Sequence, residues 1–363
     1  MVSRPSPIEG ARVWHGPDMV THSDSWTYRL TDGELAELDS AVERTKSLGV
    51  DVVDIRRENF PLPRLEETLR QVRDDLLHGA GFAVIRGFPV ERYGPQETAI
   101  AYFGLGSHLG ESVSQNARGH ALGHVCNLGF GDSLWTVPTA RGYQTAEKLI
   151  FHTDAADLVG LLCLRTAKSG GLSRIASTGA VFNAVLESRP DLIKPLMEPI
   201  YRDRRGEIPE GREPWYRLPV FNLHKGRLLT NYVRSVIQKA QRFPEAPRLT
   251  DDLVEAMDLV DSIAADPAMY LELEFEPGDI QFLCNHYITH SRTAYEDHPG
   301  PDRKRHLLRL WLACDDGPPL PAPYDEFMGK TTSGRPNGYL MPGVQLSAPL
   351  EVEYGGPEDR PAS

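Results

Sequence analysis

Three side chains in two distant parts of the sequence have the types that hold a transition-metal ion. His152 and Asp154 belong to the triplet His152-Thr153-Asp154. In an extended chain, residues i and i+2 project from the same face, so both can reach one ion while Thr153 points away. The triplet is weak evidence by itself, because such triplets occur by chance in many proteins. A third ligand has to come from a distant strand.

The C-terminal candidates for that position are His286, His290, His298 and His306. His290 follows shortly after the apolar run from Ile280 to Cys284. Two histidines and one carboxylate on one face of a metal ion leave three positions open. Non-haem Fe(II) oxygenases use this arrangement, with O2 and an organic co-substrate in the open positions. Zinc accepts the same ligands, so the triad alone does not decide the metal.

A strand predicted from Arg305 to Cys314 carries two arginines on one face. Its two faces alternate, with Arg305, Leu307, Arg309 and Trp311 on one and His306, Leu308, Leu310 and Leu312 on the other. The second face is the natural outer surface against a helix. The first would point two guanidinium groups into the core, where an unpaired charge is costly. A dicarboxylate co-substrate would compensate them through bidentate contacts. An exposed edge with ordinary salt bridges stays the alternative.

The elements that must position these residues follow from the hydrophobic pattern. It predicts helices over 32–49, 65–77, 95–108, 178–187, 233–242 and 251–265. It predicts strands over 82–87, 149–151, 158–165, 172–175, 216–221, 228–230, 270–275, 280–284 and 305–314. Glu276-Pro277-Gly278-Asp279 is a strong turn signal. Many short strands joined by turns, with inserted helices, favour a mainly β jelly-roll barrel over a parallel sheet.

The expected domain organisation is a single catalytic domain over residues 1–363. Residues 1–95 form an N-terminal helix and strand region that packs on the core. Residues 96–317 form the jelly-roll core with helical insertions, and residues 318–363 form a C-terminal extension rich in proline and glycine.

Composition narrows the partners and the location. The formal net charge of −12 argues against a nucleic-acid partner or an anionic membrane surface, since either favours a basic patch. No apolar run reaches the roughly 18 residues that a membrane span needs, and the N-terminus lacks the apolar core of a signal peptide. A cytoplasmic location is therefore expected, and a homo-oligomer stays open. Buried free thiols are expected at Cys126, Cys163, Cys284 and Cys314.

In combination, the motifs resemble the taurine dioxygenase (TauD/TfdA) family and its clavaminate synthase-like relatives, which are Fe(II)/2-oxoglutarate oxygenases. The matching stretches are 141–144, 151–157, 161–165, 169–173, 290–293 and 305–311, within a recognisable region of roughly residues 80 to 315. None of these motifs is specific alone. The resemblance implies a double-stranded β-helix, that is, a cupin-like jelly-roll core flanked by α-helices.

The resemblance also implies the metal ligands, which match His152, Asp154 and His290. His290 is preferred to His286 because relatives place the co-substrate arginine some eleven to fifteen positions after the distal histidine. Here 305 − 290 = 15, whereas 305 − 286 = 19. His286 is then expected to be a structural neighbour. Asp157 is expected to pin the loop or to orient a ligand, with a solvated turn acid as the alternative.

The co-substrate residues are implied in the same way. Arg305 matches the arginine that grips the distal carboxylate of 2-oxoglutarate. Arg309 matches a second arginine that supports that carboxylate or reaches the substrate. Ser173 follows a Gly-Gly turn, where relatives carry a hydroxyl that hydrogen-bonds the same carboxylate. A simple turn hydroxyl stays the alternative for Ser173.

The implied cofactors are Fe(2+), 2-oxoglutarate and O2. The implied reaction oxidises an unactivated C–H bond of a small-molecule substrate and releases succinate and CO2. Asp154 favours hydroxylation, or desaturation or cyclisation, over halogenation, because halogenases of this superfamily lack that carboxylate. Two other interpretations remain. A zinc hydrolase on the same barrel is disfavoured by the paired arginines, and a non-catalytic 2-oxoglutarate or metal-binding sensor is disfavoured by the intact triad.

The sequence does not specify the substrate. The expected class is a small polar molecule carrying a carboxylate, or an amino acid tethered in a biosynthetic pathway. The polar pocket candidates flank the motifs and are Gln115, Asn127, Gln144, Tyr232 and Arg234. The candidates for an apolar lining are Trp135, Trp215 and Phe221.

Overall fold

A seven-stranded sheet forms one wall of the molecule in this computed structural model, which describes residues 5–130, 141–339 and 341–352. The order is β1-β2-β14-β6-β17-β3, and β4 also pairs with β17. The strands are β1 (Thr27–Arg29), β2 (Phe82–Arg86), β14 (Ile280–Cys284), β6 (Leu158–Arg165), β17 (His306–Ala313), β3 (Glu111–Ser112) and β4 (Leu122–Val125). The pairing of β1 with β2 is parallel, and the other pairings in this sheet are antiparallel.

A four-stranded antiparallel sheet with the order β13-β8-β15-β5 forms the facing wall. Its strands are β13 (Tyr270–Leu273), β8 (Ser173–Ser177), β15 (Ile288–Arg292) and β5 (Leu149–His152). One hydrophobic core joins the two sheets and includes Ile175 and Ile288 from the smaller sheet and Leu162, Phe282 and Leu307 from the larger. The mainly β jelly-roll core is therefore confirmed.

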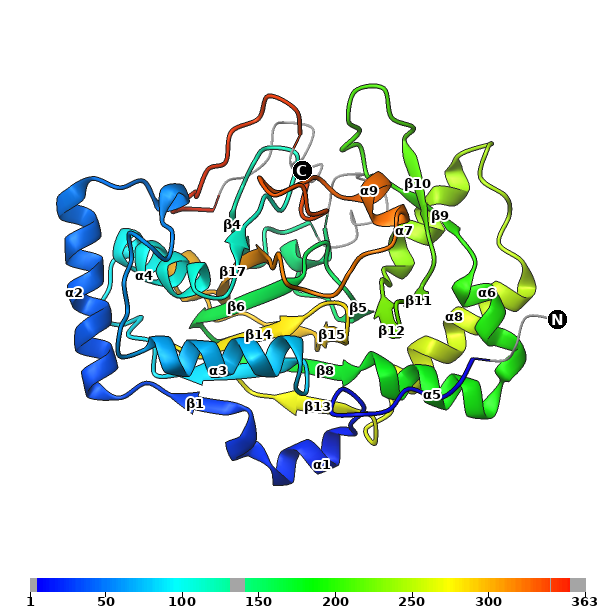
Figure 1. The fold of residues 1–363 in the computed structure, drawn as a ribbon, viewed down its shortest axis with the longest axis horizontal. Helices are drawn as coiled ribbons and strands as arrows, with labels where there is room; N and C mark the ends of the chain where they lie inside the picture. The colour runs from blue at the N-terminus through cyan, green and yellow to red at the C-terminus, as the bar shows by residue number, and fades with distance from the viewer. Residues whose placement is uncertain (1–4, 131–140, 340, 353–363) are drawn as a thin grey trace.

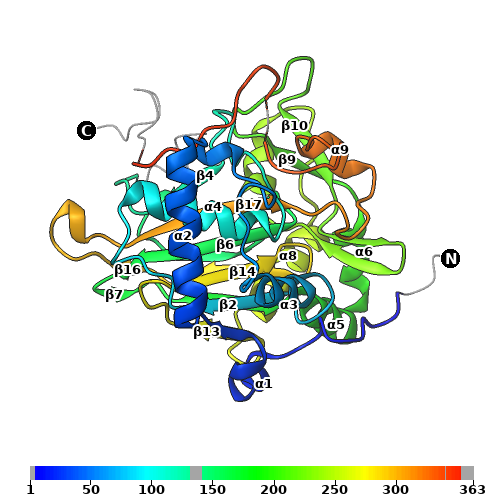
Figure 2. The same ribbon diagram turned by 60° about the vertical axis from the view of Figure 1, so that its left-hand side comes forward.

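Helices cover the larger sheet and extend the smaller one (Figure 1). The N-terminal helices are α1 (Gly16–Thr21), α2 (Asp32–Leu48), α3 (Glu66–Leu77) and α4 (Pro95–Ser107). Figure 2 shows α2 running along the outside of α4, which it contacts. Short 3-10 turns lie at Ser23–Ser25, Val52–Asp54, Gly142–Gln144, Pro190–Leu192, Ala240–Arg242 and Pro301–Arg303.

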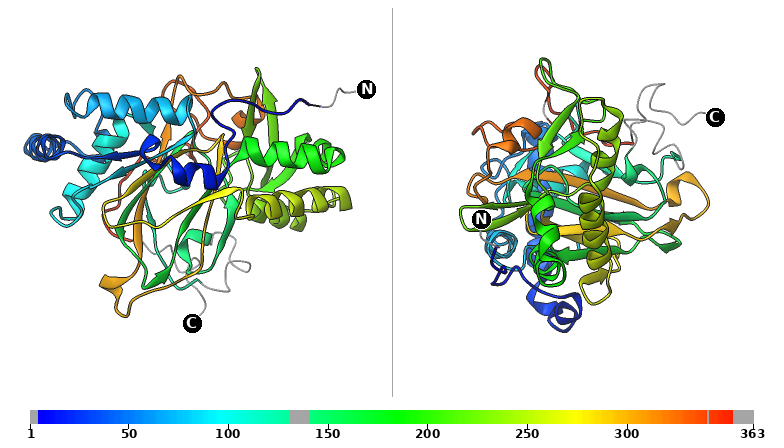
Figure 3. Two further views of the ribbon diagram at one scale, coloured as in Figure 1. Left: turned by 90° about the horizontal axis from the view of Figure 1, so that it is seen from below. Right: turned by 90° about the vertical axis from the view of Figure 1, so that its right-hand side faces the viewer.

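A second hydrophobic core lies at the opposite end of the molecule. It is built on α5 (Thr178–Ser188), α6 (Ile193–Met197), α7 (Arg234–Lys239) and α8 (Asp251–Ala264). Figure 3 shows the green α5 and the yellow-green α8 packed together, far from the blue α2. Two hairpins complete this end: β9 (Ile200–Asp203) with β10 (Trp215–Leu218), and β11 (Phe221–His224) with β12 (Arg227–Thr230). The remaining elements are β7 (Ser169–Gly170), β16 (Tyr295–Glu296) and α9 (Pro323–Phe327).

Local sequence explains several element ends. Helix α2 begins with a capping box, in which Thr31 accepts from the Glu34 backbone and Glu34 accepts from the Thr31 backbone. It ends at Gly49, whose φ of 63° lies in the left-handed region. The predicted strand over 216–221 is interrupted, because β10 ends at Leu218 and β11 begins at Phe221. Pro219 lies between them and cannot donate to a sheet.

The turn predicted before β14 is confirmed. Asp279 N donates to Glu276 O at 3.0 Å. Gly278 has φ of +90°, and a Cβ there would lie 2.3 Å from Phe88 O. Only glycine satisfies both conditions. The turn therefore fixes where β14 enters the larger sheet, between β2 and β6.

The two faces of β17 also match the prediction. On the outer face, Leu310 and Leu312 approach α4 so closely that a Cβ on Gly106 would lie 2.9 Å from Leu310 Cδ1. Arg309 and Trp311 are buried and turn toward the space between the sheets. Strand β17 therefore presents its polar face to the interior.

The predicted thiols and the C-terminal segment are also accounted for. Cys126, Cys163, Cys284 and Cys314 are free and buried, as expected. Residues 318–339 and 341–352 pack across the barrel, where Gly338 N donates to Ala155 O at 2.8 Å. Within the described ranges, no helix combines the length and the apolar character needed to cross a membrane.

Candidate active site

The three predicted metal ligands are brought together where β5 and β15 pair. His152 ends β5, and its Cα partner across the antiparallel pairing is His290 of β15. Asp154 follows two residues after His152. One donor atom from each of the three side chains lies within 4.8 Å of the others, and the two imidazole ring centroids are 4.3 Å apart. This spacing is compatible with a shared ion.

The two imidazoles are in the form that binds metals. His152 Nδ1 lies 2.9 Å from Ile150 O, and donation of the Nδ1 proton to this carbonyl leaves the Nε2 lone pair free. His290 Nδ1 is buried and has no hydrogen-bond partner among the described residues. Burial lowers the pKa of His152, and burial together with His152 lowers the pKa of His290 to about 3. Both rings are therefore neutral near pH 7.

Asp154 is held as a carboxylate by two donors on β17. Its Oδ2 accepts from Arg309 Nη1 at 3.2 Å and from Trp311 Nε1 at 3.0 Å. Burial raises the pKa of Asp154, but the charge of Arg309, the two histidines and the Trp311 contact outweigh it and lower the pKa to about 2. Both described contacts fall on Oδ2, so Oδ1 is the oxygen left to face an ion.

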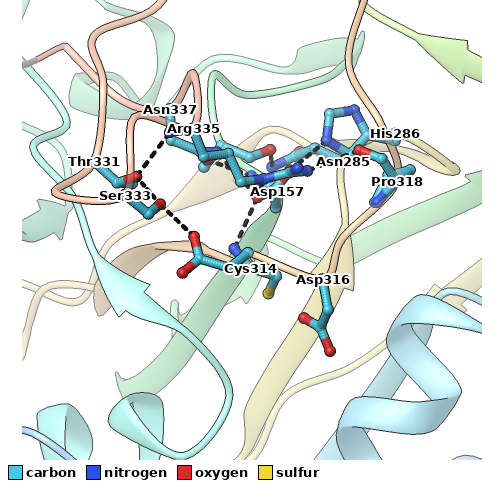
Figure 4. A network of polar contacts seen from close by, with 12 residues as sticks. Asp157, Asn285, His286, Cys314, Asp316, Pro318, Thr331, Ser333, Arg335 and Asn337 are labelled. Carbon is cyan, nitrogen blue, oxygen red and sulfur yellow. Dashed lines mark hydrogen bonds and ion pairs between the residues drawn. The ribbon is translucent and has the colours of Figure 1, made fainter.

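The loop after Asp154 is clamped by a buried polar network (Figure 4). The Asp157 carboxylate accepts from Arg335 Nε at 2.6 Å, from His286 Nε2 at 2.7 Å and from Cys314 N at 2.8 Å. Asn337 Oδ1 accepts from Asp157 N at 2.8 Å. Burial opposes ionisation, yet Arg335 and His286 lower the pKa of Asp157 to about 2. Asp157 therefore pins the loop and is no solvated turn acid.

The same network shows what His286 and its neighbour do. His286 faces Asp157, away from the pairing of His152 with His290, as expected of a structural neighbour. Asn285 Oδ1 accepts from Asp154 N at 3.0 Å, and Asn285 Nδ2 donates to Ala156 O at 3.1 Å. Asn285 thus fixes the backbone beside the predicted carboxylate ligand.

A small inner cavity of about 50 Å³ lies between the sheets beside the triad, lined by His152, His290, Ser173, Arg292, Arg305 and Arg309 among others. Arg305 Nη2 donates to Gly171 O at 3.1 Å, while Arg305 Nη1 is buried with no partner in the described structure. Burial lowers the pKa of Arg305, so the charge is costly there. An anionic group in this cavity would satisfy it. Ser173 Oγ lines the same cavity and donates to Gln281 Oε1 at 3.0 Å.

Arg292 is a second buried guanidinium in the inner cavity. Its Nη2 donates to Thr145 O at 2.8 Å, but its Nε and Nη1 have no partner in the described part of the chain. Burial lowers its pKa to about 10. The sequence placed Arg292 in a motif without giving it a role. Two buried cations with unsatisfied N–H groups fit a dicarboxylate such as 2-oxoglutarate.

Arg309 lies between the predicted metal ligand and the two cavities. Its Nε donates to Gln115 Oε1 at 2.7 Å, its Nη1 contacts Asp154, and its guanidinium lies over the Tyr143 ring at 4.6 Å. These contacts direct it to the predicted metal ligand. Arg309 also lines both the inner and the outer cavity, so both predicted roles, supporting the distal carboxylate and reaching the substrate, stay predictions.

An outer cavity of about 590 Å³ opens on the other side of His152 and Asp154. This volume is in the range of small-molecule sites. Its walls come from the segment 141–150, β10, α7, β17 and the C-terminal segment, and include Arg141, Lys148, Arg205, Tyr216, Arg234, Trp311, Phe327 and Tyr339. Phe327 and Tyr339 come from the predicted C-terminal extension, which therefore belongs to the site.

Most of the predicted substrate residues lie elsewhere. Arg234 lines the outer cavity but is paired with Asp258 and Asp261 at 2.5 and 2.6 Å. Gln115 lies behind Arg309, since its Nε2 donates to Arg309 O at 2.8 Å. Tyr232 is in the second hydrophobic core, with its hydroxyl 3.4 Å from Met257 O.

The remaining candidates hold local backbone or core structure. Gln144 Oε1 accepts from Arg141 N at 2.9 Å, and Asn127 Oδ1 accepts from Gly129 N at 2.9 Å. Neither residue lines the outer cavity as far as the structure describes it. Trp215 contacts Tyr201, Phe221 contacts Phe182, and Trp135 lies outside the described residues.

Comparisons with known proteins agree with this geometry. The family model described as taurine catabolism dioxygenase TauD, TfdA family matches residues 44–311. The chain is 35% identical over 323 residues to FR-33289 synthase of Streptomyces rubellomurinus (strain ATCC 31215), covering 87% of this chain and 93% of the relative. It is 31% identical to the taurine hydroxylase-like protein SAT17 of Stachybotrys chartarum (strain CBS 109288 / IBT 7711), covering 84% of this chain and 79% of that protein.

A solved structure shows the same fold. The crystal structure of asparagine oxygenase (AsnO) superimposes with a TM-score of 0.62 at 15% identity, covering 90% of this chain and all of that chain (100%). The double-stranded β-helix arrangement is thus shared with a protein of very different sequence.

Proposed function

The chain belongs to the taurine catabolism dioxygenase TauD, TfdA family, and from this membership we propose that it hydroxylates an unactivated C–H bond of a small polar substrate. It is an Fe(II)/2-oxoglutarate-dependent oxygenase and therefore an oxidoreductase, with Fe(2+), 2-oxoglutarate and O2 as cofactors. The observation that carries the proposal is the triad of donor atoms within 4.8 Å of one another, beside a cavity in which Arg292 and Arg305 each have buried N–H groups without a partner among the described residues.

We propose that His152, Asp154 and His290 hold the iron. The fit rests on two neutral imidazoles, one carboxylate oxygen left free and a buried His290 Nδ1 with no hydrogen bond in the described structure. When bound, the metal supplies activation of O2 coupled to decarboxylation of 2-oxoglutarate to succinate and CO2. Arg305, with Ser173 and Arg292 beside it, would bind the distal carboxylate of that co-substrate.

The remaining residues would orient the metal ligand and the substrate and would limit the access of water. Arg309 and Trp311 hold the Asp154 carboxylate so that Oδ1 faces the metal position. The outer cavity, on the other face of His152 and Asp154, would position the substrate C–H bond. Phe327 and Tyr339 from the C-terminal segment close one side of it and limit access of water. Hydroxylation is the proposed outcome, with desaturation or cyclisation as alternatives at the same centre.

The substrate class is proposed more broadly. The asparagine oxygenase of the same fold acts, by its name, on an amino acid, and an outer cavity of about 590 Å³ accommodates a molecule of that size. We propose a small substrate with at least one anionic group, since basic side chains outnumber acidic ones in the cavity lining. A single catalytic domain, a cytoplasmic location and homo-oligomeric assembly stay predictions.

The test is substrate-dependent O2 uptake with stoichiometric succinate, measured with Fe(II) and 2-oxoglutarate across a panel of amino acids and small organic acids. His152→Ala and His290→Ala should lose iron binding and succinate formation. His286→Asn should keep both, because His286 contacts Asp157. Coupled turnover retained in His152→Ala would refute the ligand assignment.

The same measurements separate the two other interpretations. A zinc hydrolase would turn over without 2-oxoglutarate or O2. A non-catalytic sensor would bind Fe(II) and 2-oxoglutarate but form no succinate with any member of the panel. Arg305 and Arg292 are buried, and each has at least one N–H group without a partner in the described structure, which favours the oxygenase over the hydrolase.

A further inference from the structure

The outer cavity is lined by basic side chains, most of which have no role in the proposed metal site or co-substrate site. Five basic side chains line it: Arg141, Lys148, Arg205, Arg234 and Arg309. Three of them are compensated by carboxylates, Arg141 by Glu207, Arg234 by Asp258 and Asp261, and Arg309 by Asp154. The described residues offer no ion pair to the other two, Arg205 and Lys148.

Arg205 is held toward the cavity by an unusual backbone conformation. Its φ is 57°, and in the described structure only Lys225 among the other non-glycine residues has a positive φ. A long side chain in the left-handed region costs about 1 kcal/mol or more. The conformation is supported locally, because Arg205 N donates to Asp203 Oδ1 at 2.7 Å and Asp203 is bound by Arg242 at 2.8 Å. Such strain is typical of functional positions.

The two unpaired cations do not reflect the composition of the chain. The formal net charge of the protein is −12, so an uncompensated basic pair inside a cavity runs against the average surface. Among the described residues, the cavity lining also contains one acid without an ion pair, Glu147. Its side chain is exposed, as is that of the neighbouring Lys148, so solvent screens both charges. Arg205, in contrast, is partly buried between β9 and the cavity.

We infer that the outer cavity binds the dianionic phosphoryl group of the substrate, a phosphonate or a phosphate monoester, against Arg205 with Lys148 as the second cation. This rests on the proposed function. A carboxylate or sulfonate carries one charge and would leave one of the two cations uncompensated. A phosphoryl group carries close to two negative charges near neutral pH and presents three acceptor oxygens. A guanidinium binds such a group through two parallel N–H contacts.

This assignment places the anion and the reaction centre on different walls. Arg205 follows β9, whereas His152 and Asp154 lie at the end of β5. The phosphoryl group would anchor one end of the substrate and leave a C–H bond at the other end to face the metal position. Arg205 is then a positioning residue for the substrate, and its loss should raise KM more than it lowers kcat.

The test uses the enzyme loaded with Fe(II) and 2-oxoglutarate without O2. Binding of methylphosphonate, methyl phosphate, methanesulfonate and acetate is measured by calorimetry. We expect the first two to bind at least about 10-fold more tightly than the monoanions, since a second charged contact contributes about that factor. The ratio of methylphosphonate to methyl phosphate affinity distinguishes the two sources of the phosphoryl group.

Three variants complete the test. Arg205→Gln keeps a side chain of similar shape in the strained conformation and should weaken methylphosphonate binding by about 10- to 100-fold, and Lys148→Gln by less. Arg217→Gln is the matched control, because Arg217 is an exposed arginine of β10 outside the cavity lining. Equal affinity for all four anions, or no change in Arg205→Gln, would overturn the inference.

Failure of the inference and failure of the proposed function are distinguishable. Tight 2-oxoglutarate binding without preference for phosphoryl anions leaves the oxygenase proposal intact and removes only the phosphoryl assignment. Absence of 2-oxoglutarate binding removes both. Retained 2-oxoglutarate affinity in Arg205→Gln shows that the variant is folded, so a loss of methylphosphonate binding then belongs to Arg205 alone.

Discussion

The indole Nε1 of Trp311 lies 3.0 Å from Oδ2 of Asp154 and donates a hydrogen bond to it. The two residues are far apart in the sequence and come together because β17 runs beside β6 across the loop that carries Asp154. The indole is buried, and the contact lies at the wall of the outer cavity. The inner face of β17 thus supplies a second donor, beside Arg309, to the proposed iron ligand.

Trp311→Phe should weaken iron binding while leaving the fold intact. Phenylalanine keeps an aromatic ring in the core but removes the N–H, so Asp154 loses one of its two donors. Loss of such a supporting hydrogen bond lowers metal affinity about 10-fold or more. Titration of Fe(II) in the presence of 2-oxoglutarate measures the effect. Trp14→Phe is the control, since Trp14 Nε1 donates to Ala80 O at 2.9 Å, outside the two site cavities. Equal iron affinity in both variants would contradict the role of Trp311.

Arg305→Gln should raise the KM for 2-oxoglutarate by about 100-fold, because a buried charge-assisted contact to a carboxylate contributes about 2 to 3 kcal/mol. The KM for the substrate should change little, since Arg305 lines the inner cavity and not the outer one. Arg174→Gln is the control on β8, where Arg174 pairs with Glu272 at 2.6 Å on the outer side. The steady-state kinetics of succinate formation give both constants. A larger change in the KM for the substrate than in the KM for 2-oxoglutarate would contradict the assignment of Arg305 to the co-substrate.

Acid should destabilise the protein through His306. Its Nε2 lies 2.8 Å from His124 Nδ1, and burial together with His124 and Arg165 lowers its pKa to about 3. In the unfolded chain, this histidine has a pKa of about 6.5. Between about pH 6.5 and 3 it is therefore protonated in the unfolded state but neutral in the folded state. The free energy of unfolding therefore falls as the pH falls below about 6.5 and continues to fall down to about 3.

Between pH 7.5 and pH 5, this single group should lower the free energy of unfolding by about 2 kcal/mol. Urea unfolding midpoints at the two pH values measure the change. His306→Asn should show a flatter pH dependence than the parent protein, whatever its stability at pH 7.5. An unchanged dependence would mean that His306 is not the group that titrates.

Arg335→Met should strongly lower the free energy of unfolding, although Arg335 lies close to the C-terminus. The substitution leaves the fully buried Asp157 carboxylate without its guanidinium partner. Removal of one member of a buried ion pair costs about 3 to 5 kcal/mol. Lys330→Met is the matched control, because Lys330 pairs with Asp325 at the surface, where such a pair contributes about 1 kcal/mol or less. Similar urea midpoints for the two variants would contradict the clamp.

Strands with continuous apolar runs could be predicted from the sequence to the residue. Strands β6 and β14 begin and end where expected, because their side chains are almost all buried and apolar. Strand β15 was not predicted as a strand. Its residues from Ile288 to Arg292 are all buried, yet four of the five are polar. Their partners are the inner cavity and the neighbouring strands, which no local pattern reveals.

The candidate substrate residues also depend on tertiary contacts that a local sequence pattern does not reveal. Proximity to a motif along the chain suggested Gln115, Asn127, Gln144 and Tyr232, but the face that a loop residue presents depends on tertiary contacts. Tyr232 packs in the second core because Thr153 holds its backbone, with Thr153 N donating to Tyr232 O at 2.9 Å. Arg205 could not be found from the sequence at all, because a positive φ at an arginine has no sequence signature.

The clamp on Asp157 has a consequence for how the protein is made. Arg335 and Asn337 leave the ribosome after His152, Asp154 and His290, and after every strand of both sheets. A nascent chain that has emerged only as far as β17 therefore has all three proposed ligands but lacks Arg335 and Asn337, which hold the loop after Asp154. In the order of translation, the clamp on the loop of the proposed iron site is therefore completed last.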